Sequence, residues 1–381
     1  MIRLRPGRSL VAAAIALGLI AAPAGPASAD SIRDKQWYLS ALDVADAQRI
    51  STGAGVTVAL VDTGVKAEHR DLRAAILPGF DATGDARGDG RDDPVGHGTE
   101  MAGIIAGRGH GGGSGILGIA PGAKIFPAGA AIDGPSNGAD IARAIDQATK
   151  SGAMVMNLSF ARPAGQNIRE AIQRARAADI VVVAGSGNTD RPAADRFPAL
   201  YPEVLSVGAV DRDGKLSKIS VTNEGVDIVA PGQDIATTGI FSSGYSIGTG
   251  TSPATAMVSG AAALIRAKYP DLSAADVIHR LTTTATDAGP KGRDDNYGFG
   301  RLNLVKALTA EVGPAPAESA AAPAASAGAP APAPVPVPDD DPPQALPLRK
   351  VLPIVLAVGA GLLVLAIGIV VIVLMIRRQR T

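Results

Sequence analysis

Ser252 is placed in this chain where a serine could act as a nucleophile. It ends a glycine-rich turn and is followed by an apolar stretch, which predicts a helix over 251–268. The first turn of such a helix has unpaired backbone N–H groups and the positive end of the helix dipole, and both favour a developing negative charge. Serine is also a preferred helix N-cap, so this position alone is compatible with a purely structural role.

A base and an acid that could activate this serine stand at two other element boundaries. Serine is a weak nucleophile until a base takes its proton, and the base needs an acid to hold its tautomer. His97 opens a second helical stretch, and Asp62 ends the apolar run 56–61, which predicts a buried strand. Open α/β sheets keep their sites at the carboxyl ends of strands. We therefore expect Asp62 to orient His97, and His97 to act on Ser252 as general base and then as general acid.

Three segments carry these residues in the order Asp, His, Ser: Asp62-Thr63-Gly64, Gly96-His97-Gly98-Thr99 and Gly248-Thr249-Gly250-Thr251-Ser252. With these segments the chain resembles the subtilisin-like serine proteases, over about 53–310. The resemblance implies an α/β fold with a doubly wound, mostly parallel sheet and helices on both faces. It also implies hydrolysis of peptide bonds through an acyl-enzyme, without a metal or an organic cofactor.

The middle of the chain alternates between expected helices and expected strands, which is typical of a doubly wound sheet. The helical segments 137–150 and 167–178 are interleaved with the apolar runs 154–158 and 180–184. The last of these runs leads to Asn188. The resemblance assigns the Asn188 amide and the backbone N–H of Ser252 to an oxyanion hole, although an isolated Gly-Asn pair is more often a turn.

The resemblance also implies substrate-binding positions at Ser159, Phe160, Ala161 and Gly185. Subtilases usually have Ser-Leu-Gly-Gly at 159–162, and this chain has Ser-Phe-Ala-Arg. If this segment continues a strand, Phe160 and Arg162 point to the same side of it. Phe160 would add bulk and Arg162 would add charge beside a strand edge that pairs with substrate, so we expect the protein to cleave only a few substrates.

Pro253 separates two classes of hydrolase. In α/β-hydrolases the backbone N–H of the residue after the nucleophile helps to build the oxyanion hole, and proline has no N–H. Ala254 also replaces the second glycine of their Gly-x-Ser-x-Gly motif. A lipase or an esterase is therefore disfavoured, whereas Ser252 keeps the N–H that a subtilase uses.

The segment 81–93 is dense in aspartate, glycine and arginine. Its spacing does not fit an EF-hand and its arginines would repel a cation, so we expect a solvated loop there and no metal site. Glu100 stands where subtilases often have a second histidine after His-Gly-Thr. We expect that position to serve packing.

Composition and the two ends of the chain indicate an exported, membrane-anchored protein. The 381 residues have a net charge of zero and no cysteine, so nucleic acid is not an expected partner and the fold must depend on its core. Arg3, Arg5 and Arg8 precede the apolar run 10–22, and Ala27-Ser28-Ala29 follows it, which predicts a signal peptide over 1–29. A retained N-terminal anchor is less favoured, because the apolar run is short.

The remaining segments predict an N-terminal arm at 30–52, a peptidase domain at 53–312 and a Pro/Ala-rich linker at 313–348. The arm is shorter than the ~40 residues below which chains rarely fold alone, so it is not expected to be a folded prodomain. The charge-free apolar run 351–376 predicts a transmembrane helix, and the arginines of 377–381 favour a cytoplasmic tail. The catalytic domain should then lie outside the cytoplasm.

The arm, the linker and the C-terminal anchor together resemble those of the mycosins, membrane-anchored subtilases tied to type VII secretion. This resemblance implies a single-pass protein of the cell membrane that cleaves exported proteins or peptides and is associated with the type VII secretion machinery. It also allows an alternative, in which the chain is a structural subunit of a secretion complex and its proteolysis is dispensable.

Overall fold

The computed structural model describes residues 31–83, 88–132 and 138–316. The expected signal peptide, transmembrane helix and cytoplasmic tail, and most of the expected linker, lie outside this part of the chain. Within the described ranges, no helix has the length and apolar character needed to cross a membrane.

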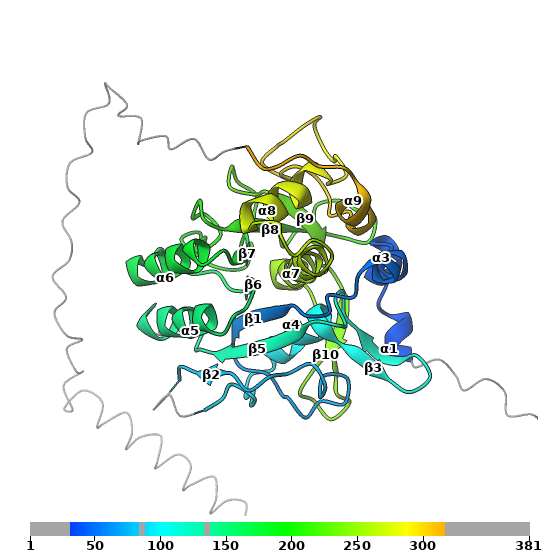
Figure 1. Cartoon of the computed structure of the whole chain (residues 1–381), viewed down its shortest axis with the longest axis vertical. Helices are drawn as coiled ribbons and strands as arrows, with labels where there is room; N and C mark the ends of the chain where they lie inside the picture. Colours follow the sequence, from blue (N-terminus) through cyan, green and yellow to red (C-terminus); the bar gives the residue numbers. More distant parts are fainter. Residues whose placement is uncertain (1–30, 84–87, 133–137, 317–381) are drawn as a thin grey trace, which may run out of the picture. The chain divides into compact units, whose positions relative to one another are not determined.

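A seven-stranded sheet forms the centre of the described chain (Figure 1), with its strands in the order β2-β5-β1-β6-β7-β8-β9. In that order the strands are β2 (Phe80–Asp81), β5 (Lys124–Gly129), β1 (Thr57–Asp62), β6 (Val155–Leu158), β7 (Val181–Gly185), β8 (Leu205–Val210) and β9 (Ile228–Pro231). Each neighbouring pair in this sheet is parallel. The expected parallel α/β sheet is therefore confirmed, and β1, β6 and β7 end at the same edge.

Alternate residues of the central strands face two different cores, because side chains alternate across a strand. Val58 and Leu60 of β1 belong to one core, and Ala59 and Val61 belong to the other. The helices that complete the first core include α4 (His97–Ala106) and α7 (Thr251–Lys268), and those that complete the second are α5 (Gly138–Lys150) and α6 (Gln166–Ala177). Figure 1 shows α5 and α6 on one side of the sheet and α7 on the other.

Helix α7 is buried on nearly all its faces. The sheet covers one side of it, and α4, α8 (Ala274–Thr283) and α9 (Leu304–Thr309) cover others. Ser273 and Asp276 form a capping box at the start of α8. The expected nucleophile, Ser252, is thus carried by a helix that its neighbours hold on several sides.

The described residues of the expected arm form three short helices that contact the rest of the fold. They are α1 (Ser31–Asp34), α2 (Tyr38–Ala41) and α3 (Val44–Ile50). Two antiparallel hairpins lie next to them. One pairs β3 (Arg108–His110) with β4 (Ser114–Leu117), and the other pairs β10 (Ile235–Thr238) with β11 (Tyr245–Gly248). The Gln36 amide exchanges two hydrogen bonds of 2.9 Å with the backbone of Leu117. The hydroxyl of Tyr38 donates to the carbonyl of Ala236 at 3.2 Å, and burial raises the pKa of this tyrosine.

Candidate active site

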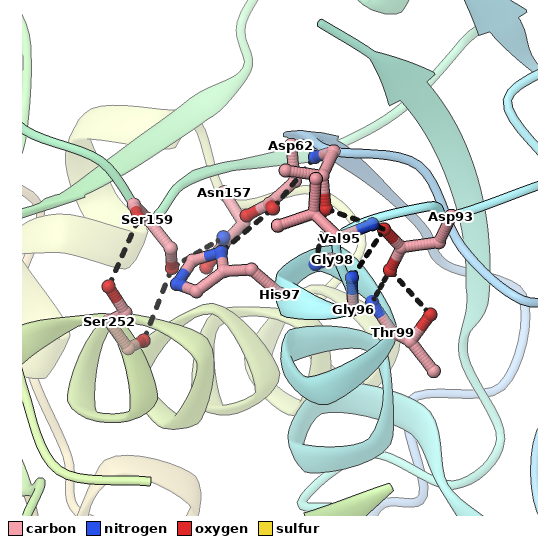
Figure 2. Close-up of polar contacts among 11 residues, drawn as sticks. Asp62, Asp93, Val95, Gly96, His97, Gly98, Thr99, Asn157, Ser159 and Ser252 are labelled. Carbon is pink, nitrogen blue, oxygen red and sulfur yellow. Dashed lines mark hydrogen bonds and ion pairs between the residues drawn. The ribbon is translucent and has the colours of Figure 1, made fainter. Parts of the chain in front are cut away.

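Asp62 and His97 meet at the carboxyl edge of the sheet (Figure 2). Asp62 ends β1 and is fully buried, and its Oδ1 accepts a hydrogen bond from Nδ1 of His97 at 2.8 Å. The same oxygen accepts from the backbone N–H of Thr63 at 2.8 Å. Because a carboxylate can only accept, the neutral ring carries its proton on Nδ1, and Nε2 is its basic nitrogen.

Two glycines allow β1 and α4 to approach this closely. A Cβ placed on Gly98 would lie 2.0 Å from the carbonyl oxygen of Gly64, and one placed on Gly64 would lie 2.0 Å from the carbonyl oxygen of Asp92. Gly64 also has a φ of +107°, in the region that favours glycine. The glycines that follow the acid and the base therefore help to set the distance between them.

Ser252 is the second residue of α7 and lies against the end of β6. Its Oγ donates to the carbonyl oxygen of Ser159 at 3.0 Å, and Oγ of Ser159 donates to the carbonyl oxygen of Ser252 at 3.2 Å. Figure 2 shows the ring of His97 with Asp62 on one side and Ser252 on the other. The structure thus brings the three expected catalytic residues into one place, at a helix N-terminus that favours an anion.

Asn188 follows β7 and lines the same cleft as Ser252. Its Oδ1 accepts from the backbone N–H of Thr251 at 3.0 Å and lies 3.2 Å from the hydroxyl of Thr251. Since a backbone N–H can only donate, the amide oxygen must face Thr251, which fixes the orientation of the side chain. The amide N–H₂ is then left as a donor on a side chain that lines the same cleft as Ser252, and an oxyanion hole requires such a donor.

The expected catalytic residues His97 and Ser252 line a cleft of about 270 Å³. Its described lining consists of His97, Glu100, Met101, Ile132, Ser159, Phe160, Asn188, Asp190, Arg191, Gly248, Thr249, Ser252 and Pro253. Two expected substrate-binding residues, Ala161 and Gly185, are not among these residues, nor is any described residue of the arm. A Cβ on Gly185 would lie 2.8 Å from Oγ1 of Thr251, so this glycine allows β7 to pack closely against α7.

The segment after β6 does not continue as the strand edge on which Phe160 and Arg162 were expected to point to the same side. The backbone N–H of Arg162 donates to the carbonyl of Phe197 at 2.8 Å, and its carbonyl accepts from the N–H of Phe197 at 3.0 Å. Strand β6 ends at Leu158, so Phe160 and Arg162 do not alternate along one continuous strand. Phe160 lines the cleft but is only 6% exposed, because it packs into the core beneath α5 and α6.

Asp93 is buried, and the expectation of a solvated loop over 81–93 is wrong for this residue. Its exposed fraction is 4%, and its carboxylate accepts from the hydroxyl of Thr63 at 2.8 Å and from the backbone N–H of Gly96 at 2.8 Å. It also accepts from the backbone N–H and the hydroxyl of Thr99 at 2.9 and 2.6 Å. Asp93 therefore joins the loop after β1, which carries the acid, to the first turn of α4, which carries the base (Figure 2).

Replacing Asp93 with asparagine is expected to lower kcat by about 10-fold to 100-fold, because small displacements of a catalytic group are costly. An amide cannot accept all the hydrogen bonds that this carboxylate accepts, so His97 would shift relative to Asp62. Steady-state kinetics and a thermal melt would measure the effect. Asp92→Asn is a matched control, since Asp92 is exposed and, among the described residues, its carboxylate accepts only from the N–H of Asp93. Equal losses in the two variants would contradict a positioning role for Asp93.

A second buried chain of hydrogen bonds lies behind Ser252. Asn157 of β6 is fully buried, donates its amide to Oγ of Ser159 at 2.8 Å and accepts from the hydroxyl of Ser259 at 2.9 Å. Ser259 lies on α7, about two helical turns after Ser252. These hydrogen bonds fix the position of α7 relative to the end of β6.

The comparisons with known proteins agree with this geometry. Residues 53–300 match the subtilase family, Peptidase S8. The chain belongs to the subtilase family. Subtilisin DY from Bacillus licheniformis is 36% identical over 261 residues, which cover 67% of this chain and 91% of that relative. Mycosin-1 from Mycobacterium tuberculosis is 36% identical over 343 residues, which cover 74% of each chain.

A solved structure of a mycosin is similar to this chain over its catalytic region. It is the structure of the serine protease MycP1, an essential component of the type VII (ESX-1) secretion system. The TM-score is 0.63 at 34% identity, over 74% of this chain and 90% of that chain. The expected resemblance to subtilases, and among them to mycosins, is confirmed. As a member of this family the chain is a serine endopeptidase that acts on protein substrates.

Proposed function

We propose that this chain is a membrane-anchored, extracytoplasmic serine endopeptidase of mycosin type that cleaves exported proteins. The observation that carries the peptidase assignment is the 2.8 Å hydrogen bond between buried Asp62 and His97, together with the cleft that His97 and Ser252 both line. The likeness to Mycosin-1 and to MycP1 supports the mycosin type and the association with type VII secretion.

In the proposed reaction, Oγ of Ser252 attacks the carbonyl carbon of the peptide bond while Nε2 of His97 takes its proton. The imidazolium that forms is stabilised by Asp62, which stays ionised. The oxyanion accepts hydrogen bonds from the Asn188 amide and the backbone N–H of Ser252. His97 then protonates the leaving amine, and water hydrolyses the acyl-enzyme with the same ring as base.

The proposed location rests on the sequence of the two ends. The apolar run 351–376 is free of charge and long enough to span a bilayer, and the segment 1–29 has the features of a signal peptide. Together they would hold the catalytic domain outside the cytoplasm, where exported proteins pass. The linker at 313–348 would separate the domain from the membrane surface.

One experiment with three versions of the chain tests both parts of this proposal. Cells would produce the wild-type chain, Ser252→Ala, or a version lacking 348–381. We expect the wild type in the membrane fraction, with cleavage of one or more exported proteins. Ser252→Ala should stay in the membrane fraction and lose cleavage. The version lacking 348–381 should appear in the medium and remain active.

Each outcome bears on one part of the proposal. A shortened chain that still sediments with membranes would contradict anchoring by 351–376. Exported proteins that are cleaved equally in cells with Ser252→Ala would contradict the catalytic role. The third outcome also needs cells that lack the chain. If cells with Ser252→Ala lose cleavage but still secrete, and cells without the chain do not secrete, the structural-subunit alternative describes the main role of the chain in the cell.

A further inference from the structure

Glu100 places a carboxyl group in the catalytic cleft. It lies on α4 three residues after His97, so the two side chains share one face of the helix. Glu100 lines the cleft together with His97, Gly248 and Thr249. The sequence led us to expect a packing role for this position, but an acid at the wall of the cleft can contact substrate.

The position of Glu100 assigns it to the leaving-group side of the cleft. The acyl half of a substrate must lie where its carbonyl oxygen can reach Asn188, at the wall formed by the ends of β6 and β7. The leaving amine must lie within reach of His97, because this ring returns the proton to it. The wall beside His97 is formed by α4 and β11, and Glu100 belongs to it.

The neighbouring strand β11 contacts the carboxyl group of Glu100 through the hydroxyl of Ser246, but it leaves space beside that group at Gly248. Gly248 ends β11 and has no side chain, and a Cβ placed on it would lie 3.8 Å from Oε2 of Glu100. Apart from atoms of the adjacent residues in the chain, this oxygen is the one atom of the described residues within 4 Å of that Cβ. A side chain at this position would stand over the carboxyl group, whereas glycine leaves space that a substrate side chain can enter.

Glu100 also lacks a cationic partner among the described lysines and arginines. Burial raises the pKa of its carboxyl group, and the nearby hydroxyl of Ser246 and the ring of His97 lower it by less. The carboxylates of Asp62 and Asp93 add to the rise. A cation brought by the substrate would lower the pKa of this carboxyl group again, because an opposite charge favours the ionised form of a half-buried acid.

From this placement we infer that Glu100 determines specificity on the leaving-group side, by favouring substrates with lysine or arginine immediately after the cleaved bond. The inference rests on the proposed peptidase site. The charge of Glu100 would meet the ammonium or guanidinium group, and the space above Gly248 would admit the long side chain. Asp190 and Arg191, the other Asp, Glu, Lys or Arg residues in the described lining of the cleft, follow β7, on the side assigned above to the acyl half of the substrate.

The test is a set of peptides that differ only in the residue after the cleaved bond: arginine, lysine, norleucine or glutamate. For the wild-type chain, kcat/KM for arginine should exceed that for norleucine by about 10-fold, the usual gain from one charge-assisted hydrogen bond. In Glu100→Gln this ratio should fall to about 1, since the amide keeps the shape and loses the charge. Glu100→Arg should favour the glutamate peptide. Asp190→Asn removes a charge from the side assigned to the acyl half and should keep the wild-type ratio.

The pH dependence of the arginine-to-norleucine ratio of kcat/KM distinguishes a charge contact from a packing role, because packing alone would not make this ratio depend on pH. Lowering the pH through the raised pKa of Glu100 neutralises the carboxyl group, while the arginine of the peptide stays charged. The arginine-to-norleucine ratio of the wild type should therefore fall toward low pH. The ratio of Glu100→Gln should not depend on pH.

The outcomes separate this inference from the proposed function. Cleavage that depends on Ser252 but shows no preference for a basic residue would overturn the inference and leave the peptidase assignment intact. A preference that persists in Glu100→Gln would also overturn it. If no peptide is cleaved in a Ser252-dependent way, both fail.

Discussion

Ser252→Ala and His97→Ala are each expected to abolish labelling of the chain by a fluorophosphonate probe. They should also lower kcat by on the order of 10⁶, the loss known when either residue is removed from a triad of this kind. The reason is that an unactivated hydroxyl is a poor nucleophile, and here its activation depends on the ring held by Asp62. Labelling of the full chain in detergent, followed by mass spectrometry of the labelled peptide, would measure the first effect.

Two matched variants control for general damage to the protein. Ser242→Ala removes an exposed hydroxyl near β11, and His279→Ala removes a ring from α8, and neither residue lines the cleft. Both variants should be labelled at the wild-type rate. Labelling of His97→Ala at the wild-type rate, or labelling that remains in Ser252→Ala, would contradict the proposed triad.

The sheet, and the meeting of the three proposed triad residues, could be predicted because both depend on local patterns. Asp62, His97 and Ser252 each stand where an apolar run begins or ends, and such boundaries are visible in the sequence. Parallel strands buried on both faces appear as short, mostly apolar runs, which is how β1, β6 and β7 appear here. Their common edge then brings residues together that are far apart in the chain.

The support of the triad could not be predicted in the same way, because it depends on tertiary contacts. Composition assigns every acid of 81–93 to solvent, yet Asp93 is buried by the donors of Thr63 and of the first turn of α4. The pairing of Arg162 with Phe197 joins residues 35 positions apart, and no local pattern indicates it. Asn157 is a different case, since an asparagine inside an apolar strand was a visible signal of a buried hydrogen bond.

Asn188→Ala is expected to lower kcat by about 10²-fold to 10³-fold and to change KM little, the usual effect of removing one oxyanion donor. The donor acts on charge that develops in the transition state, so its loss should appear in kcat. Steady-state kinetics on a chromogenic peptide would measure the change, with a thermal melt to confirm that the fold persists.

The structure shows why alanine alone is not a sufficient test. Oδ1 of Asn188 accepts from the backbone N–H of Thr251, so alanine removes both a donor to substrate and an acceptor at the start of α7. Asn188→Asp separates these two contributions, because aspartate keeps the acceptor and loses the N–H₂ donor. If the oxyanion role is correct, the aspartate variant should be at least as slow as the alanine variant, since its charge would also repel the oxyanion. Recovery of the wild-type kcat in Asn188→Asp would instead assign Asn188 to holding the first turn of α7.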